Sequence, residues 1–397
     1  MMKQSEDALG AFGQDVPVAA VPAAQVRKVL VIGGGVAGIA CALQLRKQGL
    51  HVHLIDIDLN WRAYGAGLTI TGPTLRALRT VGVLDEVVAQ GATWSGAKMH
   101  DQQGALLTEM PIPPLDDGLP ATGGILRPVL HKILADKTLA AGIEVSLGVS
   151  LVDLSQDEDG VLAWLSDGRQ ERYDLVVGAD GLYSQTRQRL FPDAPKPNFT
   201  GQVIFRLLAE RPEGFDRTHF FMGDEIKLGF NPVSPTHMYM FLLYADPENP
   251  WLTVEQQRER LYQKLAGFGS FVPQIRETVL GKNAESVNYK PLEVQLLPPP
   301  WHRGRVVLIG DAAHATTPHL ASGAGMAIED GIVLAEELGK GGTLEEALQR
   351  FTDRRFDRCR HVIENSVKLG ELEMRHGSPL EQSRLMSEAL QVLRSPI

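Results

Sequence analysis

The sequence predicts an α/β protein in which a parallel-sheet domain is interrupted by an inserted mixed β-sheet and followed by C-terminal helices. Three observations support this prediction. A short apolar strand near the start runs into a glycine-rich turn and a helix, at residues 29–45. Two further apolar strands end in glycine and aspartate, at residues 173–181 and 305–311. Between them, short aromatic and β-branched runs broken by Pro, Gly and Asn have the pattern of a mixed or antiparallel sheet.

The first unit reads as strand, glycine turn, helix and second strand. Val-Leu-Val-Ile at residues 29–32 precedes Gly33, Gly35 and Gly38, which fill the spacing GxGxxG. The first glycine permits a tight turn, the second lets a pyrophosphate approach the backbone, and the third lets the helix pack on the strand. Asp56 ends the second strand, where an acid accepts hydrogen bonds from a ribose hydroxyl. We therefore expect a Rossmann-like dinucleotide-binding unit, with Asp58 as a solvated neighbour.

Two glycine–acid turns and a second glycine-rich helix start follow downstream. Asp180 and Asp311 come directly after apolar strands, and the carboxyl ends of parallel strands form the edge at which open α/β sheets bind ligands. Pro318 then precedes a glycine-rich segment, residues 321–326, that opens a helix. A helix N-terminus of this kind suits an anion or a heteroaromatic ring that carries negative charge.

Composition excludes several classes of protein. Hydrophobic residues make up 44% and charged residues 22% of the 397 residues, as in ordinary globular domains. A net charge of −9 disfavours nucleic acid and anionic membranes as partners. The two cysteines, Cys41 and Cys359, are too few for a disulfide framework or a thiolate metal site, and we expect both to be buried in helices. The most apolar segment is too short to cross a bilayer, so we expect a cytoplasmic protein.

Three motifs in this order resemble the single-component, FAD-dependent aromatic monooxygenases of the para-hydroxybenzoate hydroxylase fold. They are GGGVAG with Asp56, GADGLYSQTR at residues 178–187, and GRVVLIGDAAHATTP at residues 304–318. Matching positions extend from Val29 to about Leu338. Ala-Ser-Gly-Ala-Gly-Met, in place of the commoner Gly-Gln-Gly-Met-Asn, is similar to the salicylate and 6-hydroxynicotinate hydroxylase branch.

The resemblance implies a role for each matched residue. The glycine turn and Asp56 would hold the ADP half of FAD, Asp311 the ribityl chain, and Arg127 another part of FAD. The implied cofactor-binding set is Gly33, Gly35, Val36, Ala37, Gly38, Asp56, Arg62, Gly67, Arg127, Asp180, Gly310, Asp311, Pro318, Gly323, Ala324 and Gly325. Arg127 could instead be a helix-start arginine that faces solvent, and Asp180 could belong to a purely structural turn. We expect His314 to be structural rather than an acid–base catalyst, and no metal site.

The resemblance also assigns the domains. Residues 1–25 are expected to be a flexible leader, residues 26–75, 101–186 and 291–340 the FAD-binding domain, residues 76–100 and 187–290 the substrate domain, and residues 341–397 the C-terminal helical region. The inserted sheet would then roof the flavin. Its pocket candidates are Arg206, His219, Phe221, Tyr239 and Phe230, because an aromatic substrate needs flat apolar walls and few polar anchors. Arg206 could pair with a substrate carboxylate or phenolate, or form an exposed ion pair instead.

The implied reaction is hydroxylation of an aromatic or N-heteroaromatic small molecule. NADH or NADPH would reduce FAD, and dioxygen would give a flavin C4a-hydroperoxide that transfers one oxygen atom to the ring. The chain would act as a monomer or homodimer. A flavin halogenase is disfavoured because the five tryptophans form no Trp-x-Trp pair. A flavin-dependent reductase or dehydrogenase on the same scaffold, and a non-catalytic nucleotide-binding protein, remain as alternatives.

Overall fold

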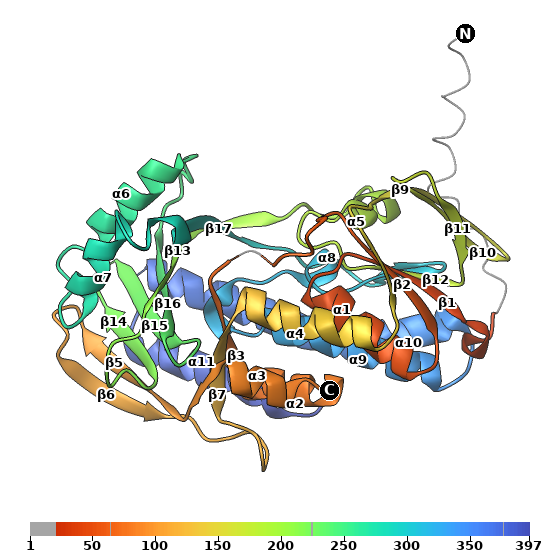
Figure 1. Ribbon diagram of the computed structural model, residues 1–397. Helices are drawn as coiled ribbons and strands as arrows, with labels where there is room; N and C mark the ends of the chain where they lie inside the picture. Colours follow the sequence, from red (N-terminus) through yellow and green to blue (C-terminus); the bar gives the residue numbers. More distant parts are fainter. Residues whose placement is uncertain (1–20, 64, 224, 376) are drawn as a thin grey trace, which may run out of the picture.

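The computed structural model describes residues 21–397 apart from residues 64, 224 and 376, and it has the expected α/β architecture (Figure 1). The first unit is confirmed. Strand β1 (Lys28–Ile32) leads into helix α1 (Val36–Lys47), which returns to β2 (His51–Asp56). β1 and β2 pair in parallel, so the helix crosses over between them in the manner of a dinucleotide-binding fold.

The main sheet has the order β18–β19–β12–β1–β2–β8. Its other strands are β12 (Leu175–Gly178) and β19 (Val306–Leu308) in the interior, and β8 (Glu144–Leu147) and the antiparallel β18 (His302–Arg303) at the two edges. β1, β12 and β19 are parallel neighbours, so the three turns that follow them lie at one edge. Two backbone hydrogen bonds continue the pairing into the turns, from Ala179 N to Ile32 O and from Ile309 N to Gly178 O. The predicted convergence of three separated turns is confirmed.

Helices cover this sheet. α1 packs on α4 (Arg127–Ala140) and on α9 (Gly323–Gly339), and α9 also contacts α2 (Gly72–Val81). α3 (Leu84–Gln90) lies beside α2 and α4. Smaller elements surround this core. One antiparallel sheet consists of β9 (Leu151–Asp157), β10 (Gly160–Leu165) and β11 (Gln170–Tyr173), and a second consists of β3 (Gly67–Thr71), β7 (Thr122–Leu126) and β4 (Ala92–Trp94). The short helices are α5 (Gln185–Leu190) and α8 (Asp311–His314).

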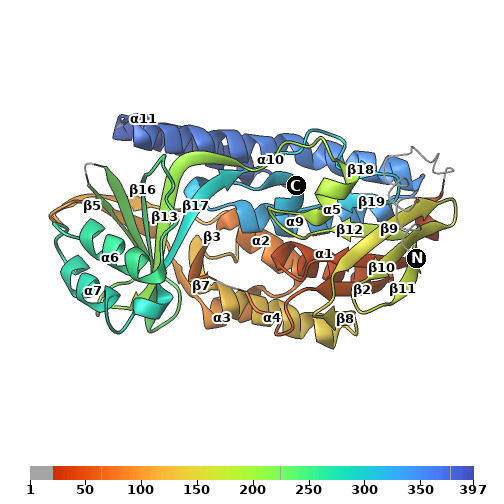
Figure 2. The same ribbon diagram turned by 90° about the horizontal axis from the view of Figure 1, so that it is seen from above.

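The inserted sheet, here called the mixed sheet, has the order β17–β13–β16–β15–β14–β5–β6. Its members are β5 (Gly96–Asp101), β6 (Leu106–Pro111), β13 (Asn198–Glu210), β14 (Thr218–Met222), β15 (Ile226–Pro232), β16 (His237–Ala245) and β17 (Asn288–Val294). It is mixed because β14 runs parallel to β5, whereas the other pairs are antiparallel. Figure 2 shows it at one end of the molecule, with α6 (Val254–Lys264) and α7 (Val272–Val279) outside it.

The two faces of the mixed sheet have different neighbours, and alternate residues of each strand face opposite sides. On β13, Val203, Phe205 and Leu207 join a buried core with residues of α6 and α7. Ile204 and Leu208 pack into separate small clusters with Leu243 and Tyr239. The face that carries Ile204, Arg206 and Leu208 is the inner face, because Gly67 of β3 contacts Tyr239 there.

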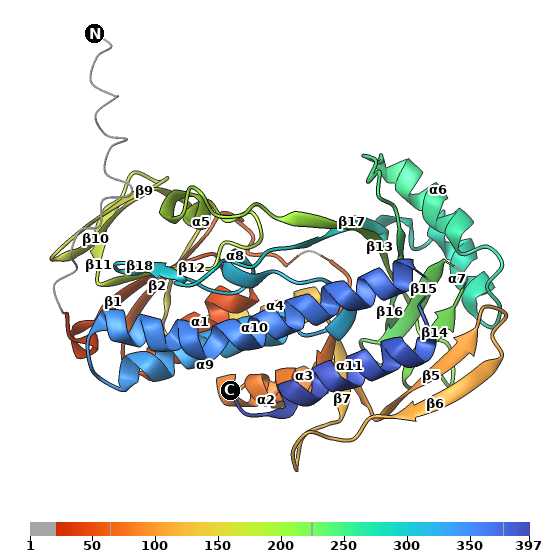
Figure 3. The ribbon, with the colours of Figure 1, turned by 180° about the vertical axis from the view of Figure 1, so that it is seen from behind.

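The C-terminal helices join both parts. Thr343 and Glu346, whose spacing is that of a capping box, form one at the start of α10 (Leu344–Met374), and α11 (Pro379–Arg394) packs back on it. Figure 3 shows α10 running from the main sheet to the mixed sheet. Both cysteines are buried in helices, as expected. Among the described residues, no helix combines the length and apolarity that crossing a bilayer requires.

Three segments lie elsewhere than the predicted boundaries put them. Residues 76–90 belong to α2 and α3, whose apolar side chains Leu75, Leu78 and Val81 are buried with the main-sheet core rather than with the mixed sheet. β6, at residues 106–111, pairs with β5 in the mixed sheet. Of the predicted leader, residues 1–20 lie outside the described residues, whereas residues 21–25 are folded. Ala23 is buried there in the short 3₁₀ helix Ala23–Gln25, and Pro22 bridges to Thr343. Other 3₁₀ turns span Ala284–Ser286 and Pro318–Leu320.

The two faces of β14 predict different effects of the same substitution. Phe221 is fully buried and packs on Phe230 and Phe271, so Phe221→Ala is expected to lower the free energy of unfolding by about 3–5 kcal/mol. Phe220 is half-buried on the inner face against Phe241, so Phe220→Ala should cost clearly less. Urea denaturation of both variants measures this difference. Equal losses would contradict the assignment of faces.

Candidate active site

The glycine turn between β1 and α1 is closed on two sides and open on the third. Gly33 has φ +103°, and a Cβ there would lie 2.5 Å from Ala179 O. A Cβ on Gly38 would lie 1.9 Å from Gly33 O, so this glycine is required for the close packing of α1 on β1. A Cβ on Gly35 would meet none of the described atoms within 4 Å. In the described chain, no side chain caps α1, so the unpaired amides of its first turn are available to an anion.

Asp56 lies beside the same turn. Its Oδ2 accepts a hydrogen bond from Gly34 N at 2.6 Å, and its Oδ1 accepts one from Asp58 N at 2.7 Å. Trp61 Nε1 donates to Gly34 O at 2.9 Å, and His131 Nε2 lies 2.9 Å from the same oxygen. Sequence reasoning missed both rings, which come from distant segments. Arg62 forms an ion pair with Asp58 at 3.7 Å, and its side chain is 58% exposed.

Asp180 is engaged within its own turn. Its Oδ1 accepts from Ser184 Oγ at 2.5 Å, and its Oδ2 accepts from Thr186 N and Thr186 Oγ1, both at 2.9 Å. These contacts support the structural alternative for this carboxylate. Arg187, from the same motif, donates to Ala312 O at 2.8 Å and to Leu182 O at 2.7 Å, and so ties the second turn to the third.

Asp311 and Arg127 are brought together with Arg206 and Tyr239. Asp311 is exposed at the surface of the site, but many protein atoms surround its carboxyl group, and this partial desolvation raises its pKa. The positive charges of His314 and Arg127 oppose the rise. Burial lowers the pKa of the half-buried Arg127, and the nearby Arg206 guanidinium lowers it further. Arg127 is therefore only partly exposed, and a second guanidinium group lies near it.

The backbone beside these side chains is built from glycine. A Cβ on Gly65 would lie 2.9 Å from Arg127 Cδ, and one on Gly67 would lie 2.7 Å from Tyr239 Cβ. Arg206 Nε donates to Tyr239 Oη at 3.1 Å. The segment that ends in Gly67 therefore passes between Arg127 and the inner face of the mixed sheet, and Gly67 is one of the residues for which the resemblance implies contact with FAD.

A buried charge network supports the turn that carries Asp311. Asp330 of α9 accepts hydrogen bonds through Oδ2 from Gly310 N at 2.7 Å and from His314 Nε2 at 2.6 Å, and through Oδ1 from Arg355 Nε at 2.8 Å. Burial alone would raise the pKa of Asp330, but His314 and Arg355 hold it below its usual value. Burial opposes protonation of His314, yet Asp330 raises its pKa well above the usual value. His314 thus acts structurally, as the sequence predicts.

The same network includes the thiol of Cys359, and these three groups lie as close together as metal ligands would. The atoms of His314, Asp330 and Cys359 are within 4.8 Å of one another. However, the Arg355 guanidinium already binds Asp330 and lies 3.7 Å from Cys359 Sγ. A second cation in this space would face a permanent positive charge, so the cluster is occupied by arginine rather than suited to a metal.

The second glycine-rich helix start differs in part from its expected role. α9 begins at Gly323 after Ser322, whose hydroxyl donates to Leu320 O rather than capping the helix. Gly323 and Ala324 are half-buried, next to the Pro318–Leu320 turn. A Cβ on Gly325, however, would lie 2.3 Å from Thr74 Oγ1. The absence of a side chain at Gly325 is therefore explained by its packing on α2.

The predicted pocket residues separate onto the two faces of the mixed sheet. Arg206 and Tyr239 lie on the inner face, near Arg127. Phe221 and Phe230 lie in the core under α6 and α7, and His219 stacks there against Phe215 and His100. Burial lowers the pKa of His219 to about 4. These three side chains therefore do not reach the inner face. Besides Tyr239, the aromatic residues on that face include Phe220 and Phe241, which sequence reasoning missed.

Comparison with known proteins identifies the family. Residues 27–366 match the family described as FAD binding domain. The chain belongs to this family. It is 32% identical to a putative FAD-dependent monooxygenase of Bacillus subtilis (strain 168), over 93% of this chain and 99% of that one. It is 33% identical to the 2-heptyl-3-hydroxy-4(1H)-quinolone synthase of Pseudomonas aeruginosa, over 87% and 89%.

Solved structures agree in fold. Klebsiella pneumoniae HpxO in complex with FAD and uric acid matches with a TM-score of 0.79 and 24% identity, over 93% of this chain and 92% of that one. The tetrameric form of 2-methyl-3-hydroxypyridine-5-carboxylic acid oxygenase matches with a TM-score of 0.75 and 25% identity, over 88% and 93%. The predicted FAD-dependent monooxygenase, with FAD as cofactor, is thereby confirmed, and the reductase and the non-catalytic protein are disfavoured.

The residues of this flavoprotein fit FAD. Two helix N-termini without side-chain caps, those of α1 and α9, lie in the described chain on either side of the Asp311 turn, and the position of a Cβ on Gly35 is open. Diphosphate oxygens need unpaired amides, and a flavin ring that carries negative charge needs a positive environment, to which Arg127 contributes.

Gly35 and Gly38 form a matched pair for testing the glycine turn. Gly35→Ala places a methyl group in open space at a backbone conformation that alanine adopts, so the fold should remain. The methyl group should keep the diphosphate away from the amides, and the FAD dissociation constant should rise roughly 10- to 100-fold, as for lost hydrogen bonds to a charged group. Gly38→Ala collides with Gly33 O and should lower the melting temperature strongly. Flavin fluorescence and thermal unfolding measure the two effects. FAD affinity unchanged in Gly35→Ala would contradict the site.

Asp330→Asn should be among the more destabilising single changes, because it leaves Arg355 and His314 without their buried partner. We expect a loss of about 3–5 kcal/mol in the free energy of unfolding. The pKa of Asp330 is lowered in the fold, so its contribution to stability is present above the pKa of an unfolded Asp and is lost as pH falls. The pKa of His314 is raised in the fold, so its contribution is present below the pKa of an unfolded His and is lost as pH rises. The pair therefore contributes most between about pH 4 and pH 6.5.

Urea denaturation from pH 5 to pH 8 measures this contribution, which the Asn variant should lack. Asp357→Asn, on α10 with a side chain 77% exposed, is the matched control and should change little. Similar stabilities for the two variants would show that the network is dispensable.

Proposed function

We propose that this FAD-dependent monooxygenase hydroxylates a small, electron-rich aromatic or N-heteroaromatic anion held against the inner face of the mixed sheet. The observation that carries the proposal is the Arg206–Tyr239 pair, which lies beside Gly67 and Arg127 with half-buried aromatic rings on the same face. A guanidinium with aromatic walls is the combination that binds an aromatic carboxylate or phenolate.

FAD would extend between the two uncapped helix ends. Gly35 and the first turn of α1 would hold the diphosphate, and Asp56 would accept a hydrogen bond from the adenosine ribose. Asp311 would bind the ribityl chain, while the Gly65–Gly67 segment, Pro318 and Gly323 would border the ring. When bound and reduced by NADH or NADPH, FAD supplies the activation of dioxygen.

The protein's own residues would orient the substrate and keep it anionic. The Arg206 guanidinium favours the ionised form of a bound phenol or lactam, which makes the ring more nucleophilic. Tyr239 accepts a hydrogen bond from Arg206 Nε and so fixes the direction of the guanidinium. Phe220 and Phe241 pack edge to face at 6.1 Å, and such apolar walls exclude water from the reacting edge of the ring.

Relatives support the substrate class. The quinolone and uric acid named for two of them, and the hydroxypyridine carboxylic acid named for a third, are all heteroaromatic rings with acidic groups. Phenolic acids, hydroxypyridines, quinolones and purines are therefore the compounds to test.

The proposal predicts substrate-dependent transfer of one oxygen atom. With the FAD-loaded protein, NADH and NADPH are offered in turn, and an anionic aromatic substrate should stimulate their oxidation and gain one atom from isotope-labelled dioxygen. Arg206→Met should raise the KM for that substrate roughly 10- to 100-fold with FAD content unchanged. Mass spectrometry of the product and steady-state kinetics provide the two readouts.

Arg384→Met is the matched control, because Arg384 lies on α11 with a side chain 79% exposed and pairs only with Glu388 among the described residues. It should leave KM unchanged. If no aromatic compound stimulates oxidation of NADH or NADPH and no labelled product forms, the proposal is wrong and a reductase is favoured.

A further inference from the structure

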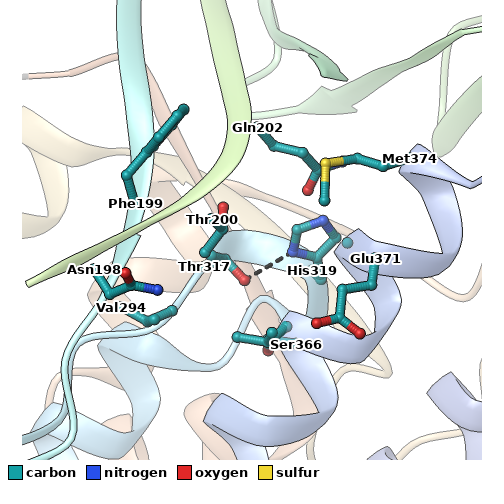
Figure 4. A pocket seen from close by; sticks show the side chains of 12 residues that line it. Asn198, Phe199, Thr200, Gln202, Val294, Thr317, His319, Ser366, Glu371 and Met374 are labelled. Carbon is teal, nitrogen blue, oxygen red and sulfur yellow. Dashed lines mark hydrogen bonds between the residues drawn. The ribbon is translucent and has the colours of Figure 1, made fainter. Parts of the chain in front are cut away.

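A pocket lies between the mixed sheet and the C-terminal half of α10, four residues along β13 from Arg206. It has a volume of about 150 Å³. Figure 4 shows side chains from β13, β17, the Thr317–His319 turn and α10 around it. Asn198 and Glu371 are exposed at its rim, whereas Gln202, Thr317, His319 and Ser366 are buried. It therefore combines an accessible rim with a polar, buried floor, as ligand pockets do.

The amide of Gln202 has a defined orientation. Its Nε2 donates to Glu373 Oε2 at 3.3 Å, and since a carboxylate only accepts hydrogen bonds, the NH₂ group must be on that side. Its Oε1 is then directed away from Glu373, and it finds no partner among the described residues although Gln202 is only 2% exposed. A buried acceptor without a donor is costly, so this oxygen marks a place for an N–H or O–H group.

Ser366 provides a second such group. It is fully buried on α10, and its Oγ also lacks a partner within the described structure. Gln202 and Ser366 both line the pocket, and Figure 4 shows them on either side of His319. A ligand that satisfies both needs polar groups on opposite edges.

The charges around the pocket exclude an anion. Glu373 accepts hydrogen bonds from Lys227 Nζ at 2.7 Å and from His319 Nε2 at 3.2 Å, so both of these donors already have an acidic partner. His319 Nδ1 accepts from Thr317 Oγ1 at 2.8 Å, which occupies its second nitrogen. Glu371 adds a negative charge at the rim. The charges at the pocket therefore differ from those around Arg206.

We propose that this pocket binds a small neutral N-heteroaromatic lactam of the pyridone type. The ring N–H would donate to Gln202 Oε1, and the ring carbonyl would accept from Ser366 Oγ. Phe199, Val294 and Met374 would supply apolar walls. The size fits one ring, because a cavity of about 150 Å³ holds a benzene molecule in a well-studied engineered protein.

The site goes beyond the proposed hydroxylation. Gln202 and Arg206 lie on the same face of β13 four residues apart, which separates them by roughly 13 Å along the strand. Thr317 and His319 flank Pro318, so a molecule in the pocket would contact the turn next to the proposed flavin ring. Binding here needs no turnover and can be measured by itself.

The test is isothermal titration of the purified, FAD-loaded protein with 2-pyridone and 4-pyridone, each compared with its N-methyl derivative. At least one pyridone should bind, and its N-methyl derivative, which has no N–H donor, should bind roughly tenfold or more weakly. Ser366→Ala, which removes only the hydroxyl, should weaken binding of that pyridone by a similar factor.

A matched pair of glycine substitutions tests the location. A Cβ on Gly370 would lie 2.6 Å from Gln202 Oε1, so Gly370→Ala should abolish binding. Gly339→Ala, at a helical glycine whose Cβ would make only an ordinary contact at 3.5 Å, should leave binding unchanged. If neither pyridone binds, the pocket holds water only and the inference is wrong. Equal binding of the methylated compounds, or binding unaffected by Ser366→Ala and Gly370→Ala, would also overturn it.

These outcomes are independent of the proposed function. If no pyridone binds but the oxygenation assay gives labelled product, the pyridone-binding proposal is wrong and the hydroxylase proposal stands. If a pyridone binds tightly but no aromatic compound stimulates NAD(P)H oxidation, the pyridone-binding proposal stands and the hydroxylase proposal is wrong.

Discussion

The candidate active site depends on one buried carboxylate. Asp330 receives hydrogen bonds from the backbone of Gly310, from the ring of His314 and from the guanidinium of Arg355. These donors come from the end of β19, from α8 and from α10, so one side chain fixes how three segments meet. A buried charge is tolerated only when its neighbours satisfy it fully, and here each of its two oxygens has at least one donor. Asp311 follows Gly310 directly, so the network also determines where the Asp311 carboxylate points.

Much of the nucleotide-binding half could be predicted from the sequence because its signals are local. The roles of Gly33 and Gly38 follow from spacing alone, and the contacts that a Cβ would make at these positions agree with them. The capping box at Thr343 is equally local. By contrast, Trp61 and His131 both bind the carbonyl of Gly34, and their separations along the chain leave no pattern that connects them to it.

The inner face of the mixed sheet illustrates a different limit. Along β13 and β14, apolar residues occupy both alternating sets, so period-two alternation does not show which set faces the helices. Phe220 and Phe221 are identical in type, and a shift of one residue reverses their faces. Sequence reasoning therefore named the aromatic residue on the wrong face of β14. The information lies in the amphipathic helices α6 and α7, which bury one face only after the whole chain has folded.

The path of α10 has a mechanical consequence. At about 1.5 Å per residue, its 31 residues form a rod about 46 Å long. The rod is attached to the nucleotide-binding half through Arg355 and to the centre of the mixed sheet through the Lys227–Glu373 ion pair, whose side chains are 16% and 10% exposed. Moving the mixed sheet away from the main sheet as a rigid body would require breaking this largely buried charge pair. The pair therefore opposes separation of the two halves, so side-chain rotations and movements of short loops are the less costly routes into and out of the site.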